Sequence, residues 1–278
     1  MAEVSDDDRY RLFKFRKIDK RLLESLVHSE IYFAPPDRLN DPFDCKVDIP
    51  KALERAISKS PQGVRPTLER LREKISSIEK VQADFANPGV CSFSLELVNT
   101  LMWSHYADEH RGVCLMYDFP MSFFENASPE IIGTFRFDYK ANSLTDWFID
   151  QAHHFSGTFA EFGVSLIKKI LTIKAPAWEY EQEARILRKS AGKYALDKQY
   201  LKQVCFGLET PEPDIALVRN LLNRFGYEVT YCKIVRSSGS DFGIDVEEIS
   251  SRAEFKAAEE LKATIRATLP DEAKLEDD

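Results

Sequence analysis

Residues 178–185 read WEYEQEAR, a segment in which three glutamates occupy alternate positions and an arginine follows them. In a β-strand successive side chains point to opposite faces, so Glu179, Glu181, Glu183 and Arg185 would share one face. In a helix the same charges would spread around the axis, and Glu181 and Arg185 would form an ordinary solvated ion pair four residues apart. The two interpretations predict different chemistry.

The residues that follow favour the strand. Residues 184–189, ARILRK, alternate apolar and basic side chains, which indicates a strand from about Glu181 onward. An exposed acidic strand is a charged edge that discourages aggregation. If that face lines a cleft, the carboxylates raise one another's pKa and require a cation, which Arg185 or Lys14 would supply.

Composition indicates a soluble, cytoplasmic chain with a substantial core. The 278 residues are 44% hydrophobic and carry a net charge of -8, so we expect one domain and no global attraction to nucleic acid or anionic membrane. No stretch approaches the roughly 20 apolar residues of a membrane span. The five cysteines are odd in number and widely separated, which predicts reduced core residues rather than a disulfide framework or a metal cluster.

Hydrophobic periodicity predicts an α+β fold with a mixed or antiparallel sheet. Helical insertions are expected at about residues 51–85 and 141–173, and a charged C-terminal helix at about 250–268, before a frayed acidic tail. Expected strands are RLFKFRKI (11–18), IYFAPP (31–36), GVCSFSLE (89–96), GVCLMYDF (112–119), IIGTFRFDY (131–139), ARILRK (184–189), LKQVCFGL (201–208) and EVTYCKIV (228–235).

Several common site motifs are absent from the sequence. The 11 glycines are scattered, so neither a P-loop nor a dinucleotide-binding fingerprint is present. No His-Glu-x-x-His, paired Cys-x-x-Cys or EF-hand spacing occurs, and no metal is expected. The neighbouring His153 and His154 would point to different sides of a helix.

Two polar features lie near the N-terminus. Lys14 and Arg16 share a strand face, where such residues usually form a solvated edge but are also suited to bidentate contacts with a pyrophosphate. Asn40, Asp41 and Asp44 surround a Pro-Phe pair, a pattern typical of a turn. These carboxylates would alternatively orient Arg16.

A third feature combines a strand with the helix after it. Ser92 and Ser94 share one strand face, and Trp103 and Tyr106 are neighbours at helical spacing. Such an aromatic pair more often packs in the hydrophobic core than stacks on a cofactor. Both residues and His105 nevertheless carry polar atoms, which need partners when buried.

Taken in order, the motifs resemble those of a known bacterial family. LFKFRKI, IYFAPPDRLNDPFDC, CSFS with LMWSHYADEHRGVCLMYDF, and WEYEQEARI are similar to the domain of unknown function 2971, from about Leu12 to Ile186. The same order resembles, more distantly, the ADP-ribosyltransferase superfamily. This second resemblance implies a central split sheet and NAD as substrate, although the chain lacks a Ser-Thr-Ser triplet and carries a long helical insertion.

The resemblance implies roles for particular residues. Glu183 would stabilise the oxocarbenium-like transition state of ribose–nicotinamide cleavage, and Glu181 would orient the acceptor. Arg16 with Lys14 would bind the pyrophosphate, and Ser92 or Ser94 with Tyr106 would form the Ser/Tyr element. Trp103 or Tyr106, beside His105, would stack on the nicotinamide or contact the acceptor. The residues that would orient these groups from behind are Asn40, Asp41, Asp44 and Arg185.

The resulting hypothesis is an ADP-ribosyltransferase or NAD glycohydrolase in bacterial defence or a toxin. Its acceptor would be a protein or nucleic acid, and its partners a cognate antitoxin or further copies of the chain. One alternative is a non-catalytic module that senses a nucleotide or a nucleic-acid end. Another is a metal-dependent nuclease that uses Asp41, Asp44 and Glu183 with Lys14, because hard cations bind clustered carboxylates.

Overall fold

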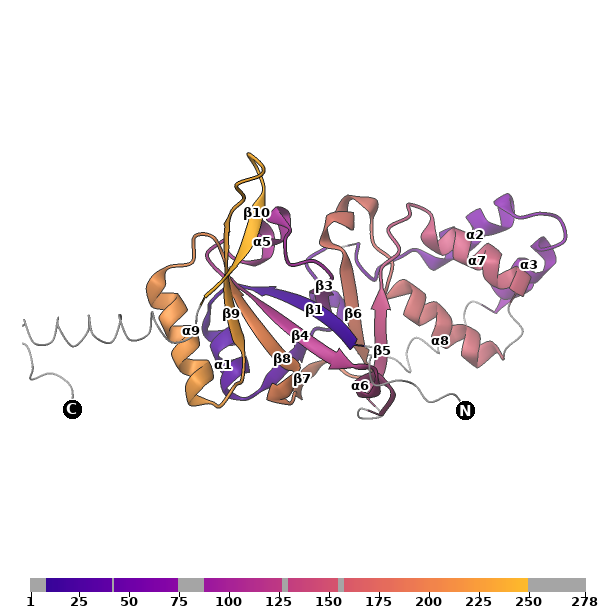
Figure 1. Cartoon of the computed structure of the whole chain (residues 1–278). Helices are drawn as coiled ribbons and strands as arrows, with labels where there is room; N and C mark the ends of the chain where they lie inside the picture. Colours follow the sequence, from indigo (N-terminus) through magenta and orange to yellow (C-terminus); the bar gives the residue numbers. More distant parts are fainter. Residues whose placement is uncertain (1–8, 42, 75–87, 127–129, 155–157, 250–278) are drawn as a thin grey trace, which may run out of the picture.

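A curled, mixed sheet of eight strands forms the frame of the protein (Figure 1). The computed structural model describes residues 9–41, 43–74, 88–126, 130–154 and 158–249. In spatial order the strands are β10 (Ile244–Glu248), β9 (Thr230–Arg236), β8 (Leu201–Phe206), β4 (Val113–Pro120), β1 (Arg9–Arg16), β3 (Gly89–Ser94), β6 (Glu183–Arg188) and β5 (Ile131–Arg136).

The sheet divides between β1 and β3. β1 pairs with β4 from Arg9 to Arg16, but the register of β1 with β3 contains only the pair Phe13 and Ser94 among the described residues. β8 and β9 are parallel, and the other neighbouring pairs of the eight strands are antiparallel. In Figure 1, β6 and β5 stand upright beside the fan formed by β1, β4 and β8. The division opens the sheet near Phe13.

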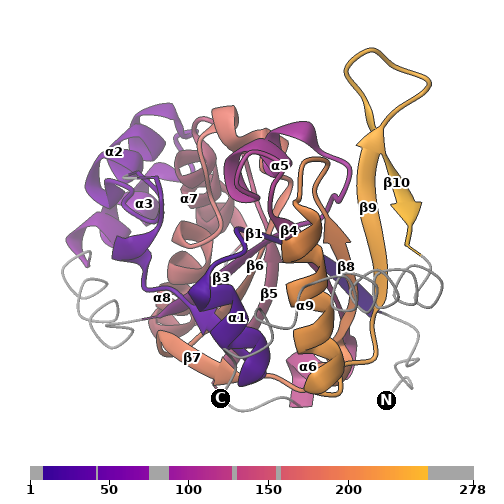
Figure 2. The same ribbon diagram turned by 90° about the vertical axis from the view of Figure 1, so that its left-hand side faces the viewer.

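Both faces of the β1 half are covered because its strands are apolar on each side. Leu12 packs into a core with α1 (Lys20–Val27) and α9 (Glu212–Arg224), and Figure 2 shows these two helices side by side. Phe15 packs on the opposite face with α5 (Thr100–Tyr106). Cys114, Cys205 and Cys232 are buried on that second face as free thiols.

The two segments predicted as helical insertions pack against each other beyond β5. They contain α2 (Ile49–Lys59), α3 (Arg65–Glu73), α7 (Ser143–His154) and α8 (Phe159–Ile170), which share a hydrophobic cluster of their own. Figure 1 shows this helical lobe on the side of the sheet opposite α9. Part of the first insertion, residues 75–85, and the predicted C-terminal helix lie outside the described residues.

Short elements complete the architecture. β2 (Glu30–Phe33) pairs with β7 (Gly192–Ala195) in a separate two-stranded sheet, and β7 and β10 were not expected from the sequence. The remaining elements are α6 (Met121–Asn126) and the 3₁₀ helices η1 (Pro36–Arg38), η2 (Pro176–Glu181) and η3 (Lys198–Tyr200). The predicted α+β class with a mixed sheet is confirmed. Across the described residues, every helix is too short or too polar to cross a bilayer.

The strand expected from about Glu181 begins two residues later, and the acidic face that a longer strand would have given Glu179, Glu181 and Glu183 does not form. Glu179 and Glu181 belong to the 3₁₀ helix η2, and the strand β6 begins only at Glu183. Pro176 starts η2 because its fixed φ suits the first turn of a helix. Gln182 then adopts a left-handed conformation, with φ 43°, and redirects the chain. Glu179 remains exposed, whereas Glu181 and Glu183 are buried.

Candidate functional site

A small polar cavity lies where the sheet divides. Its volume is about 140 Å³, and its walls come from β1, β3, α5, β6 and the segment that contains η2. The polar residues that line it are Lys14, Asn40, Ser92, Ser94, Tyr106, Lys174, Glu181, Glu183 and Arg185. Phe13, Phe15, Phe93 and Met102 complete the lining.

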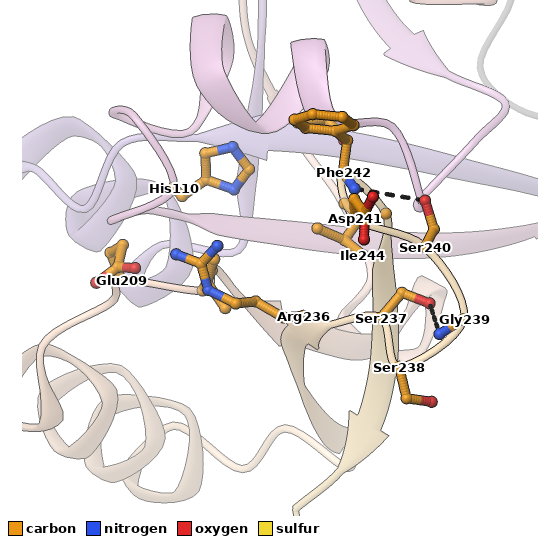
Figure 3. A pocket seen from close by; sticks show the side chains of 13 residues that line it. His110, Glu209, Arg236, Ser237, Ser238, Gly239, Ser240, Asp241, Phe242 and Ile244 are labelled. Atoms are coloured by element: carbon orange, nitrogen blue, oxygen red, sulfur yellow. Dashed lines mark hydrogen bonds between the residues drawn. The ribbon is translucent and has the colours of Figure 1, made fainter.

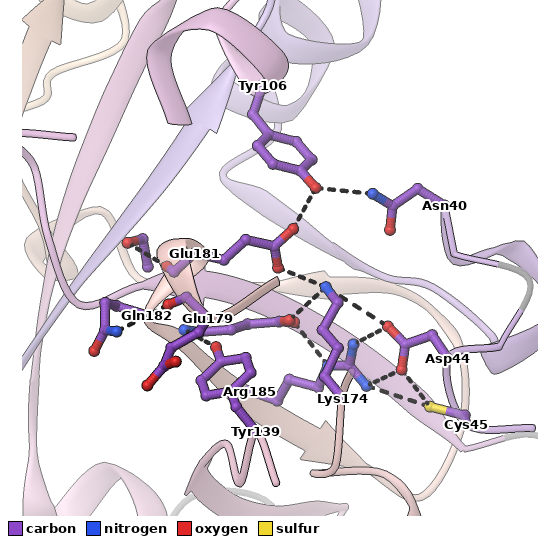
Figure 4. Close-up of polar contacts among 12 residues, drawn as sticks. Asn40, Asp44, Cys45, Tyr106, Tyr139, Lys174, Glu179, Glu181, Gln182 and Arg185 are labelled. Atoms are coloured by element: carbon purple, nitrogen blue, oxygen red, sulfur yellow. Dashed lines mark hydrogen bonds and ion pairs between the residues drawn. The ribbon is translucent and has the colours of Figure 1, made fainter. Parts of the chain in front are cut away.

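Two carboxylates of this cavity share one ammonium group. Lys174 Nζ donates to Glu181 Oε2 at 2.5 Å and to Glu183 Oε2 at 2.9 Å (Figure 4). All three residues are at most 7% exposed. Lys174 is the single charged residue of the mainly apolar segment 171–178, LTIKAPAW. Its ammonium group lies 5.0 Å from the ring centroid of Trp178. Lys174 is therefore the buried counter-ion of the pair.

Arg185 anchors Glu183 from the second side. Its Nε donates to Glu183 Oε1 at 2.8 Å, and its two terminal nitrogens form a bidentate pair with Asp44, at 3.0 and 2.5 Å. The guanidinium also donates to the carbonyl oxygen of Leu171 at 3.0 Å and lies over the ring of Phe137. Because Arg185 is 1% exposed, these contacts compensate for its loss of hydration.

Glu181 is held by hydroxyl and amide groups. The hydroxyl of Tyr106 donates to Glu181 Oε1 at 2.5 Å and accepts a bond from the side-chain amide of Asn40 at 2.8 Å. Ser94 Oγ donates to the backbone carbonyl of Glu181 at 2.8 Å. Figure 4 shows Asn40, Tyr106, Glu181 and Lys174 as one continuous chain of polar contacts.

The two glutamates titrate differently. Burial would raise the pKa of Glu183, but the charges of Arg185 and Lys174 and a hydrogen bond from Ser92 lower this pKa to about 2. Burial raises the pKa of Glu181 above its ordinary value, and the opposing effects of Lys174 and Tyr106 do not cancel it. As expected for neighbouring carboxylates, the charge of Glu183 contributes to the raised pKa of Glu181. The pKa of Glu183 is nevertheless lowered, because it has two cations within hydrogen-bond distance, the expected Arg185 and Lys174.

Lys174 is the residue that the sequence interpretation missed. Lys14 was expected to supply a cation to the glutamates, but its Nζ donates to the carbonyl oxygen of Ser92 at 2.8 Å and lies over the ring of Phe93. Lys14 lines the cavity without forming an ion pair with any described carboxylate. A lone lysine between Ile173 and Ala175 was the available signal, since an isolated charge in an apolar segment needs a buried partner.

Three predicted ligand-binding residues lie away from this cavity. Arg16 lines a different cavity, which also contains Arg21 and Arg38. Trp103 is 0% exposed and packs against Phe15 and His110, so the interpretation of this tryptophan as core is confirmed and a stacking role is wrong. His105 is exposed beside Tyr180 and does not line the cavity.

The Asx-rich segment has both a turn and an electrostatic function. Asp41 Oδ1 accepts a hydrogen bond from the backbone N–H of Phe43 at 2.9 Å, which confirms the predicted turn. Asp44 pairs with Arg185, not with Arg16 as expected. Within the described ranges, no group of three or more His, Cys, Asp and Glu side chains is placed to hold a metal ion, so the trio Asp41, Asp44 and Glu183 does not form the expected nuclease centre.

A larger cavity of about 880 Å³ lies under the loop between β9 and β10. His110, Glu209 and Arg236 line it together with the loop residues 237–243 (Figure 3). None of the residues predicted to bind or transform a ligand lines this cavity. The paired glutamates therefore make the smaller cavity the candidate functional site.

Comparison with known proteins gives a match to a family model over part of the chain and no activity. Residues 102–186 match the model of a family described as a protein of unknown function, DUF2971. The matched region contains Tyr106, Lys174, Glu181, Glu183 and Arg185. No curated protein and no solved structure matches the chain. The predicted resemblance to this family is supported for the matched region.

Proposed function

We propose that the chain cleaves the bond between nicotinamide and ribose in NAD, as an ADP-ribosyltransferase or an NAD glycohydrolase. The reaction centre is the cavity lined by Glu181 and Glu183. The observation that carries the proposal is a pair of buried carboxylates that share Lys174 and yet have pKa values moved in opposite directions.

Such a pair suits cleavage of a glycosidic bond. When the C–N bond breaks, its electron pair leaves with nicotinamide and positive charge develops on the ribose. A carboxylate that is already ionised and fixed stabilises this charge without reorganisation. Glu183 fits this requirement because Arg185 and Lys174 hold it in one position and in one charge state.

Glu181 is the group suited to proton transfer. Its raised pKa brings proton binding closer to neutral pH than that of an ordinary glutamate. In the proposed reaction the acceptor hydroxyl or water forms a bond to the ribose carbon, and its proton passes to Glu181. Tyr106 and Asn40 are positioning residues, because they orient the Glu181 carboxylate through the contacts at 2.5 and 2.8 Å.

The volume of the cavity limits which part of the substrate it holds. At about 140 Å³ it is similar to an engineered cavity of about 150 Å³ that accommodates benzene. Sites for whole drug-sized ligands measure about 300–1,000 Å³. The cavity therefore suits one ring of the dinucleotide, and the rest of the molecule would lie outside it.

Release of nicotinamide from NAD by the purified full chain tests the proposal. Glu183→Gln removes the fixed negative charge and is expected to lower the rate by at least about a hundredfold. Glu181→Gln is expected to lower it also, because the proton acceptor is lost. Glu179→Gln is the matched control, since Glu179 lies two residues from Glu181 but is exposed. Equal rates for Glu183→Gln and Glu179→Gln would overturn the proposal.

A second candidate is a module that binds a nucleotide without cleaving it. The observation that favours it is that all four carboxylate oxygens of Glu181 and Glu183 already accept bonds, from Tyr106, Lys174 and Arg185. A closed network of this kind stabilises a fold without any chemistry. Calorimetric titration with NAD, followed by recovery of the ligand, separates the two candidates, because a binding module returns NAD intact.

A further inference from the structure

A third cavity, of about 470 Å³, is lined by four cationic side chains. Arg16 at the end of β1, Arg21 in α1, Arg38 in η1 and Lys193 in β7 all contribute to its walls. Tyr32 of β2 also lines it. These elements are consecutive in the chain except β7, which pairs with β2. The cavity is thus built mainly by residues 16–38.

Within the part of the chain that the structure describes, the three guanidinium groups have no carboxylate partner. Among the described residues, no side-chain hydrogen bond or ion pair involves Arg16, Arg21 or Arg38. The two glutamates of the cavity are already neutralised, because Glu30 pairs with Lys193 at 2.9 Å and Glu24 with Lys20 at 3.7 Å. The cavity therefore presents a positive charge on a chain whose net charge is -8.

Guanidinium groups that are not paired with a carboxylate are suited to binding phosphate. Each guanidinium presents a planar set of N–H donors that matches two phosphate oxygens, and it is more weakly hydrated than an ammonium group. Three of them from three elements surround the cavity, so more than one phosphate group would be contacted. A single phosphate would leave at least part of this donor set unused.

The exposed ring of Tyr32 indicates that the ligand carries a nucleobase as well as phosphate groups. This side chain is 45% exposed at the wall of the cavity. An exposed aromatic face next to arginines provides a stacking surface for a nucleobase. The volume falls within the range of about 300–1,000 Å³ that small-molecule sites occupy. We propose that this cavity is a binding site for a nucleoside diphosphate, held by Arg16, Arg21 and Arg38 with its base on Tyr32.

This site is separate from the glutamate cavity but adjoins it. Lys14 lines the glutamate cavity and Arg16 lines the guanidinium cavity, two residues further along β1. In the same way Asn40 lines the former and Arg38 the latter. Both cavities therefore take wall residues from β1 and from residues 38–40. The proposal requires binding only, so it does not depend on cleavage of NAD.

Calorimetric titration of the full chain with ADP and with inorganic pyrophosphate tests the site. The double variant Arg21→Ala with Arg38→Ala is expected to weaken ADP binding by about tenfold or more for each guanidinium removed. Both side chains are exposed and make no side-chain bonds among the described residues, so the variant is expected to fold. Arg11→Ala with Arg224→Ala is the control, because these exposed arginines carry the same charge and line neither cavity.

Two further variants test the nucleobase contact and the independence of this site from NAD cleavage. Tyr32→Ala is expected to weaken binding of ADP but not of pyrophosphate, and an equal effect on both would overturn the nucleobase contact. Glu183→Gln is expected to keep ADP binding even where it abolishes cleavage of NAD, so the two proposals fail independently. Absence of binding for both ligands, or an affinity that the double arginine variant leaves unchanged, would overturn the site.

Discussion

Glu181 and Glu183 bind the same ammonium group although they belong to different elements. Glu181 ends the 3₁₀ helix η2 and Glu183 begins the strand β6, with Gln182 between them in a left-handed conformation. Lys174 Nζ lies 2.5 Å from one carboxylate and 2.9 Å from the other. This relationship makes stability and the proposed chemistry depend on the same few charges.

The shared ammonium group is expected to contribute strongly to stability. Lys174→Met removes the charge and keeps much of the side-chain length, so two buried carboxylates lose a common partner. Breaking a buried ion pair by removing one member costs about 3–5 kcal/mol, and we expect the free energy of unfolding at pH 7 to fall by that amount in urea denaturation.

The control for this variant is a surface ion pair. Lys17 pairs with Asp108 at 3.1 Å but is largely exposed, and Lys17→Met is expected to cost less than about 1 kcal/mol. Similar losses for the two variants would contradict the role assigned to Lys174.

Stability is expected to fall in acid because of Glu183. Its pKa is lowered from 4.5 to about 2 in the folded protein, so the ionised carboxylate stabilises the fold above pH 4.5. This contribution, about 3 kcal/mol, is lost as the pH falls from 4.5 toward 2. Denaturation curves of the wild type and Glu183→Gln between pH 6 and pH 2.5 are expected to converge as the pH decreases. A difference that is independent of pH would show that the carboxylate charge is not responsible.

The hydroxyl of Tyr106 is expected to set the pH dependence of catalysis. Its hydrogen bond opposes the rise in the pKa of Glu181, so Tyr106→Phe raises that pKa further. If ionised Glu181 accepts a proton, the ascending limb of the rate–pH profile for nicotinamide release moves to higher pH. The rate at pH 7 is then expected to fall relative to the wild type.

Tyr194→Phe provides the control for this measurement. The ring of Tyr194 packs against Phe33 on the small sheet, and this tyrosine does not line the glutamate cavity. Its substitution is expected to leave the profile unchanged. If the ascending limb of the rate–pH profile lies at the same pH for Tyr106→Phe and the wild type, Tyr106 has no part in the proposed mechanism.

The backbone at position 182 is expected to favour glycine over alanine. Gln182 has φ 43°, a conformation that costs an ordinary L-residue roughly 1–2 kcal/mol and that glycine adopts freely. Gln182→Gly and Gln182→Ala both lose the side-chain bond to the carbonyl oxygen of Glu179. The glycine variant is therefore expected to be more stable than the alanine variant by about 1 kcal/mol in thermal or urea unfolding. The reverse order would mean that this turn relaxes to another conformation.

Local sequence patterns predicted most strands and helices but not which side chains would contact one another. The alternation in RLFKFRKI marks β1 correctly, yet it does not show that Lys14 would donate to the backbone of Ser92. The three alternate glutamates of residues 178–185 were compatible with a strand or a helix, and the residues after them favoured a strand from about Glu181. A proline at position 176 and a left-handed residue at 182 instead divided the segment into a 3₁₀ helix and a strand.

The α+β class, the apolar faces of most strands and helices, and the concentration of charge near Glu183 could be predicted from the order of residues, because these features depend on residues close together in the chain. Three features required the folded chain: Lys174 neutralises both glutamates, Asp44 pairs with Arg185, and Arg16 lines another cavity. The physical reason is that charges buried in a low-dielectric interior are stabilised by whichever opposite charge the fold brings within about 3 Å, and distance along the chain does not determine that choice.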